Sequence, residues 1–334
     1  MRTILFCILC FTSLTVRALQ PPIPLVVYAY ESLVGEGTLG ALLKSEYESR
    51  YQSPIILVPF GSAGEALNRV RTENKVNPSN GRADVVLGLD STDSGVDDES
   101  IWEPIEDGLK VNIPAALNFS RYCLPFDHSY LAILYHHKMW KNKPPLKSLT
   151  ELVSRSDLKK SLVIQDPRTS SIGFSLLLWA RSALGPEKST EFWKGLTPTL
   201  VSVSPGWSSG YGMFLKNESA MVSSYLTSVA YHRENESGSD IDAFIFPEGH
   251  YHQIECAAVL KTSPRKEAAM NFLKLLVDPK IQSQLPKLQW MFPVLSTVKL
   301  PDSFKNLPSV KPLSLMATTA EKKAWLNEWK RNVR

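Results

Sequence analysis

The N-terminal third of the chain alternates β-rich runs with amphipathic segments, and this alternation restricts it to an α/β fold with largely parallel strands. Residues 25–30 and 55–60 are rich in β-branched and aromatic residues and predict strands. Between them, residues 39–47 carry apolar side chains at helical spacing. Residues 61–64, Gly-Ser-Ala-Gly, lead into a second helix, and residues 84–88 predict a third strand. The order predicts a βαβαβ unit.

The full chain of 334 residues is long for a single core and indicates two lobes. No linker rich in Pro or Gly separates the lobes, so we expect more than one crossing between them. Residues 123–135 and 250–260 have extended patterns and are the candidate hinge strands. We therefore assign residues 24–122 and 257–334, including the C-terminal helices, to the first lobe, and residues 123–256 to the second.

Residues 1–18 have the features of a secretory signal peptide. Arg2 precedes an apolar run, and small residues flank Arg17 at a cleavage site near Ala18. The apolar run is too short to remain as a membrane span. We expect a soluble, exported protein.

The charge balance excludes two classes of partner. Removing Arg2 and Arg17 lowers the formal charge from +4 to about +2. A nearly neutral chain offers no electrostatic basis for binding nucleic acid or a membrane surface.

Cys123 and Cys256 are the two cysteines left after cleavage. An even pair in an oxidising compartment is consistent with a disulfide, particularly if the two hinge strands run side by side. Two buried, unpaired thiols are the alternative.

The sequence lacks two common signatures of catalysis and of cofactor binding. It contains no His-Glu-x-x-His helix and no phosphate-binding loop of the Walker type. Glu248, His250 and His252 alternate, as a metal site on one strand face would require, but alternating polar residues more often mark a solvated face. We expect neither a metal nor a cofactor.

Two hydroxyl-rich turns are candidates for binding an anion. Ser170 and Ser171 directly precede an apolar helical run, where they either cap the helix or join its free N–H groups around an anion; the two roles are compatible. Ser62 and Ala63 lie in the Gly-Ser-Ala-Gly turn, which is either a similar cradle or a plain loop.

Four tryptophans illustrate two different contexts. Trp325 and Trp329 are four residues apart on the last predicted helix and are expected to pack. Trp207 and Trp290 stand among turn-forming or extended residues, where a ring either packs or stacks on a flat cationic ligand.

With these residues identified, the chain resembles the periplasmic thiamine-binding proteins of bacterial ABC importers, within the type II solute-binding protein superfamily. The matching stretches follow the family's order along nearly the whole mature chain. They include residues 28–32, 67–69, 83–90, 124–127, 165–170, 176–179, 206–208, 211–212, 214–216, 224–225, 230–232, 248–251 and 290–291.

The resemblance implies an α/β fold of two lobes that close on a ligand in the cleft between them, with hinge strands connecting the lobes. It implies a monomer in the periplasm that binds thiamine, thiamine monophosphate or thiamine diphosphate and passes it to an ABC transporter permease, without catalysis. Its implied ligand-binding residues are Tyr30, Trp207, Tyr231 and Trp290 around the rings, and Ser62, Ala63, Ser170, Ser171, Ser224, Tyr225, Leu226, Thr227 and Ser228 towards the hydroxyethyl or phosphate end.

The chain departs from the family pattern at the edge of this pocket. Ser62 and Ala63 replace an acidic residue and a glycine, Leu226 replaces a threonine, and Glu36-Gly37 stands where the family has a tryptophan. Three alternatives therefore remain: a binding protein for a phosphonate, a polyamine or another flat cation; a ferric-binding protein, against which the absence of a Tyr-Tyr pair argues; and a thiamine-degrading enzyme with a free cysteine nucleophile.

Overall fold

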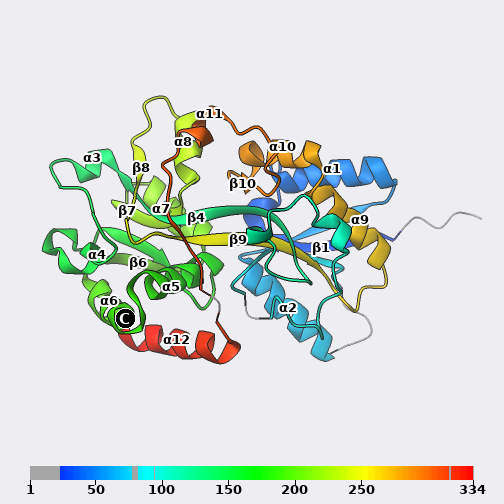
Figure 1. Ribbon diagram of the computed structural model, residues 1–334, viewed down its shortest axis with the longest axis horizontal. Coiled ribbons are helices and arrows are strands. Elements are labelled where there is room, and N and C mark those ends of the chain that lie inside the picture. Colours follow the sequence, from blue (N-terminus) through cyan, green and yellow to red (C-terminus); the bar gives the residue numbers. More distant parts are fainter. Residues whose placement is uncertain (1–22, 77–81, 94, 316, 334) are drawn as a thin grey trace, which may run out of the picture.

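The computed structural model describes residues 23–76, 82–93, 95–315 and 317–333, and they form two α/β lobes (Figure 1). The predicted signal peptide lies outside the described residues. The first lobe is built from β1 (Leu25–Tyr30), α1 (Leu39–Tyr51), β2 (Ile55–Phe60), α2 (Ala63–Val76), β3 (Val85–Asp90), α9 (Lys266–Leu276), α10 (Pro279–Leu288) and β10 (Phe292–Pro293). The predicted βαβαβ order is present.

The second lobe contains most of the middle of the chain. Its elements are α3 (His137–Trp140), α4 (Glu151–Ser154), β5 (Leu162–Gln165), α5 (Ser171–Leu184), α6 (Pro186–Leu196), β6 (Leu200–Ser204), α7 (Trp207–Leu215), β7 (Met221–Tyr225), α8 (Ser228–Asn235) and β8 (Ile241–Phe244).

Two long strands, β4 (Leu124–His136) and β9 (His250–Val259), run between the lobes and pair antiparallel (Figure 1). They join the two halves into one sheet with the order β2-β1-β3-β9-β4-β7-β5-β6. The pairs β1–β2, β1–β3, β5–β6 and β5–β7 are parallel. The strands expected as hinge crossings are therefore the centre of the sheet.

A disulfide joins Cys123, just before β4, to Cys256 in β9. Both residues are fully buried in an apolar cluster with Trp102, Tyr122 and α2 residues. The cross-link therefore ties the two crossing strands together on the first-lobe side.

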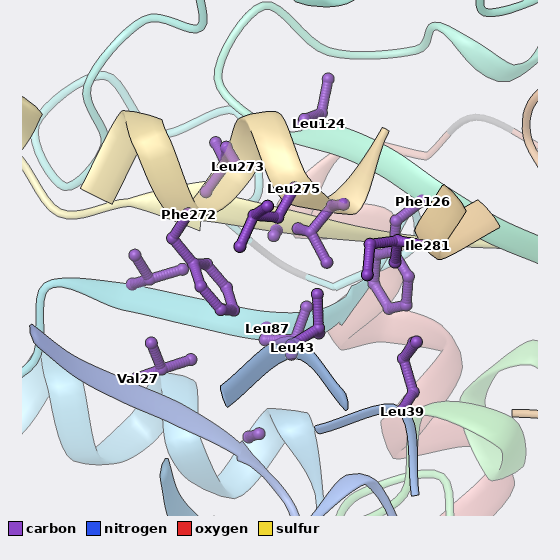
Figure 2. Close-up of a cluster of buried hydrophobic side chains, with 14 of the residues drawn as sticks. Val27, Leu39, Leu43, Leu87, Leu124, Phe126, Phe272, Leu273, Leu275 and Ile281 are labelled. Atoms are coloured by element: carbon purple, nitrogen blue, oxygen red, sulfur yellow. The ribbon is translucent and has the colours of Figure 1, made fainter. Parts of the chain in front are cut away.

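Each lobe has its own apolar core. In the first lobe, side chains of β1, β3, α1, α9 and the start of β4 meet, with Val27, Leu87 and Phe272 completely buried (Figure 2). In the second lobe, α5 supplies a run of buried side chains, including Leu177 and Trp179, because this helix is covered on nearly all sides. The two lobes therefore bury their apolar side chains largely separately.

Of residues 257–334, all assigned to the first lobe, the part up to Leu295 packs there, whereas the part from α11 (Asp302–Lys305) onward packs on the second lobe. The last helix, α12 (Thr319–Asn332), lies along α6 (Figure 1), and its Trp329 is buried in the second-lobe core. Glu328 accepts hydrogen bonds from Arg181 and Thr190. The preceding α11 lies against α8, and β11 (Pro312–Leu313) pairs with β9.

The start of α12 agrees with its sequence. Thr318 and Glu321 form a reciprocal capping box, in which each side chain accepts a backbone N–H of the other residue. Among the described residues, no helix has both the length and the apolar character needed to cross a membrane.

Candidate ligand-binding site

A cavity of about 460 Å³ lies between the lobes and takes its walls from both. It is large enough for a small organic molecule. It is bounded by Tyr30, Glu31, Ser32, Gly61, Ser62, Ala63, Gly88, Ser170, Ser171, Ile172, Trp207, Ser208, Tyr211, Gly212, Leu215, Tyr225, Ser228, Tyr231, Gln253, Glu255, Leu288, Gln289, Trp290 and Met291.

Four helices begin at this cavity. Ala63, Ser171, Trp207 and Ser228 are the first residues of α2, α5, α7 and α8, and all four line the cavity. The first N–H groups of a helix have no partner within the helix and carry its positive dipole end. One helix comes from the first lobe and three from the second, so an anionic group between them would contact both lobes.

Ser170 is both the cap of α5 and a wall of the cavity. Its Oγ accepts from the backbone N–H of Gly173 at 3.5 Å. Ser171 Oγ donates to Asp93 Oδ1 of the first lobe at 3.5 Å. Ser170 therefore has the capping role, and the Ser171 hydroxyl already bridges the lobes.

Trp207 has a different setting from the one predicted, because it opens α7 and does not lie in an irregular turn. Its ring stacks on Tyr211 with centroids 4.6 Å apart, and its Nε1 donates to Ser224 Oγ at 2.9 Å. Both contacts fix the ring at the cavity wall.

Trp290 lies between α10 and β10, outside any helix as predicted, and has an unusual backbone. Its φ of 57° is in the left-handed region. Its ring meets Tyr231 edge-on at 5.0 Å. Trp290 follows an element of the first lobe and Tyr231 belongs to α8 of the second, so the two rings meet across the cleft.

Three of the predicted residues do not line the cavity. Leu226 is buried in an apolar cluster behind the wall. Thr227 Oγ1 is hydrogen-bonded to Ser129 Oγ at 2.9 Å. Ser224 is fully buried and holds the Trp207 ring in position. The remaining predicted residues, Tyr30, Ser62, Ala63, Ser170, Ser171, Trp207, Tyr225, Ser228, Tyr231 and Trp290, all reach it.

The sequence analysis missed the polar floor of the cavity. Gln253 and Glu255 of β9 and Gln289 after α10 line it, together with Tyr30. Tyr30 Oη donates to Glu255 Oε2 at 2.7 Å and accepts from Gln289 Nε2. One signal was available, because Glu255 is an isolated charge within a predicted buried strand.

Burial controls the ionisation of this floor. Burial, together with the nearby carboxyls of Asp90 and Asp93, raises the pKa of Glu255 to about 8, although the Tyr30 hydrogen bond opposes the change. Burial, with the Glu255 charge second, raises the pKa of Tyr30 well above its usual value. The floor is therefore largely uncharged at neutral pH.

The residues weighed as a metal site are used elsewhere. His250 is buried between the carbonyl of Leu131 and the N–H of Phe246, and Glu248 accepts the N–H of Leu149. Within the described part of the chain, no three His, Cys, Asp or Glu side chains gather as metal ligands would.

Residues 43–312 match the family of bacterial extracellular solute-binding proteins. The chain belongs to this family. Thiamine-binding periplasmic proteins of Salmonella typhimurium and Escherichia coli are each 38% identical to this solute-binding protein, across 92% of its chain and 93% of theirs.

Solved structures show the same fold for this solute-binding protein. A periplasmic thiamin binding protein superposes with a TM-score of 0.83 and 36% identity, covering 94% of this chain and 97% of its own. The fructose-6-phosphate-bound periplasmic binding protein AfuA of Actinobacillus pleuropneumoniae, at 16% identity and a TM-score of 0.78, supports the fold alone. The expected two-lobed α/β fold and family membership are confirmed.

Proposed function

We propose that this protein is the periplasmic solute-binding component of an ABC importer, which binds thiamine or its phosphates in the cavity between the lobes and delivers them to the permease. The observation that carries the proposal is the distribution of the cavity's chemistry. Aromatic rings from both lobes form one wall, and the starts of four helices form another. This arrangement suits a flat cation with a hydroxyl or phosphate end.

The relatives support the same ligand. The two enterobacterial proteins that share 38% identity over almost the full chain are named for thiamine binding. The departures at Ser62, Ala63 and Leu226 do not remove an aromatic ring from the cavity, and Leu226 does not reach it. We therefore retain thiamine and propose a monomer as the binding unit.

The mechanism is closure of the lobes on the ligand. A ligand that contacts both lobes stabilises the closed state by the free energy of the contacts that the open state lacks. The lobes already approach closely at the mouth of the cavity: a Cβ added to Gly206 would lie 3.6 Å from the carbonyl oxygen of Gly61. The helix starts and Trp290 then face each other across the ligand.

The alternative of a thiamine-degrading enzyme loses its nucleophile. Cys123 and Cys256 are bonded to each other and fully buried. Neither residue lines the cavity. A thiolate that attacks the ligand would have to be free and within the cleft.

Isothermal titration calorimetry of the ligand-stripped mature protein with thiamine, thiamine monophosphate and thiamine diphosphate tests the proposal. We expect one-to-one binding that Trp207→Ala weakens by roughly 30-fold, or about 2 kcal/mol, because the cation loses a stacked ring. Trp325→Ala is the control, since Trp325 lies on α12 away from the cavity. Absence of binding to all three compounds would refute the proposal.

A further inference from the structure

Three acidic residues of three neighbouring strands lie in one row beneath the cavity. In the sheet, Glu255 of β9 is paired with Asp90 of β3 on one side and with Asp127 of β4 on the other. The pairing of β3 with β9 has a register shift between Leu87 and Leu89 of β3. The pairing of β4 with β9 has one between Pro125 and Asp127 of β4. Together these shifts align the three carboxyls, of which Glu255 lines the cavity.

The row has too few positive partners to be fully ionised. Asp90 and Asp127 are completely buried, and both carboxyl oxygens of Asp127 lack a hydrogen-bond partner among the described residues. Lys322 of α12 is the cation that acts on Asp90, and it donates its hydrogen bond to the carbonyl of Thr92. A buried carboxyl without a partner for its charge is stabilised in the neutral form.

The groups around Glu255 act in both directions: the neighbouring carboxyls favour its neutral form, whereas hydrogen bonds from the Tyr30 and Tyr225 hydroxyls favour its charged form. Like charges within a low-dielectric site disfavour further ionisation, and phenols remain protonated at neutral pH. The groups are Asp90 and Asp93 at the end of β3, Asp127 of β4, Tyr30 of β1, Tyr225 of β7 and, next to the two β3 carboxyls, Lys322 of α12.

A second polar group of the floor lacks a partner. Gln253 lies two residues before Glu255 on β9 and lines the same cavity. Its Nε2 donates to Tyr225 Oη at 2.8 Å, but its Oε1 has no hydrogen-bond partner among the described residues. A buried acceptor left unpaired is unfavourable, and a donor on a ligand would supply the missing hydrogen bond.

We propose that Glu255 in its protonated form and Gln253 determine specificity for an amino-substituted nitrogen heterocycle, the Glu255 carboxyl donating to a ring nitrogen and Gln253 Oε1 accepting from the exocyclic amino group. A neutral carboxyl supplies the donor that a carboxylate lacks. In thiamine, the aminopyrimidine ring presents this pair of groups. The assignment rests on the proposed function and adds the chemistry by which the uncharged ring is recognised.

The pH dependence of affinity distinguishes this proposal from a simple counter-ion role. A donor with a pKa of about 8 is fully available below that pH and is lost above it. Thiamine affinity should therefore be constant from pH 6.5 to 7.5 and fall by about fivefold to tenfold at pH 9. If Glu255 served as a carboxylate facing the thiazolium cation, affinity would instead rise across the same range.

Glu255→Gln is the matched variant, because an amide has a donor and an acceptor at every pH. We expect its thiamine affinity to show no decrease between pH 7 and pH 9. The 4-oxo analogue of thiamine, which places an acceptor where the amino group was, should bind wild type at least about 100-fold more weakly, since two acceptors would face each other.

Calorimetric titrations of both proteins between pH 6.5 and 9, each in two buffers of different ionisation enthalpy, measure affinity and proton exchange together. A wild-type affinity that is flat or rises with pH, or an equal decrease in Glu255→Gln, overturns the role of Glu255 and leaves the proposed function standing. Tight binding of the 4-oxo analogue overturns the role of Gln253. Failure of wild type to bind thiamine at any pH refutes both this inference and the proposed function.

Discussion

At Trp290, the cost of a strained backbone can be measured separately from the contribution of the ring to binding. Its φ of 57° places a bulky residue in the left-handed region, where a side chain with a Cβ costs roughly 1–2 kcal/mol. Its ring lines the cavity and contacts Tyr231 across the cleft. The strain persists because the surrounding structure holds the ring at this position.

Two substitutions remove the same ring and differ in strain. Trp290→Ala keeps a Cβ in the left-handed conformation, whereas Trp290→Gly relieves it. We expect the glycine variant to have the higher free energy of unfolding, by about 1 kcal/mol, even though glycine elsewhere costs about 0.5–1 kcal/mol relative to alanine. Both variants should lose thiamine affinity equally, by roughly 30-fold, because both lack the ring.

Urea unfolding followed by circular dichroism gives the stability difference, and calorimetry gives the affinities. Comparing the two variants cancels the loss of ring packing, which affects both. An alanine variant as stable as the glycine variant would refute the left-handed backbone at Trp290. Affinities that differ between the variants would show that the backbone, and not the ring alone, determines binding.

Three further predictions concern the sheet and the contact between lobes. A protein loses stability as pH rises from the unfolded-state pKa to the raised folded-state pKa of a buried acid such as Asp127. Asp127→Asn should therefore stabilise the protein in urea unfolding, by an amount that grows between pH 5 and pH 8. An equal effect at both pH values would contradict this prediction. Replacing both Cys123 and Cys256 by serine should destabilise the protein by about 4–5 kcal/mol, because their bond closes a loop with a sequence separation of 133. Urea unfolding measures this change, and a loss of stability below about 1 kcal/mol would disprove the prediction. Lys322 Nζ donates to the Thr92 carbonyl at 2.6 Å between the lobes, so Lys322→Met should speed thiamine dissociation about fivefold in stopped-flow fluorescence, and an unchanged rate would show that this contact does not hold the closed state.

The parts of the fold that depend on local pattern were predictable from the sequence. The strand and helix order of residues 25–90 follows from apolar spacing, and the crossing strands were visible as two long extended runs. The capping box at Thr318 fixed the start of α12. The lobe on which α12 packs was not predictable, because an amphipathic pattern shows which face is buried and does not identify the surface that buries it.

The site residues likewise divide into those that the sequence predicted and those that only the fold reveals. Ser171 was found because the hydroxyl and the helix are adjacent in sequence, whereas Ser228 came from the family resemblance. Leu226 and Thr227 were predicted from the family resemblance, but Leu226 packs in a second-lobe cluster and Thr227 bonds to Ser129 of β4, which only the fold determines. Glu255 was passed over because its importance depends on strand partners more than 120 residues away, a relation set by register.

The alternation of β9 explains how one strand serves both the hinge and the cavity. Successive side chains of a strand point to opposite faces, so Gln253 and Glu255 share the face that forms the cavity floor. Cys256, the next residue, lies on the other face in the cluster that contains its partner Cys123. The disulfide therefore fixes β9 against β4 without entering the cavity, and the register that aligns Asp90 and Asp127 with Glu255 is held covalently at the adjacent residue. A change that loosens this cross-link should alter the ionisation of Glu255 as well as the stability of the sheet.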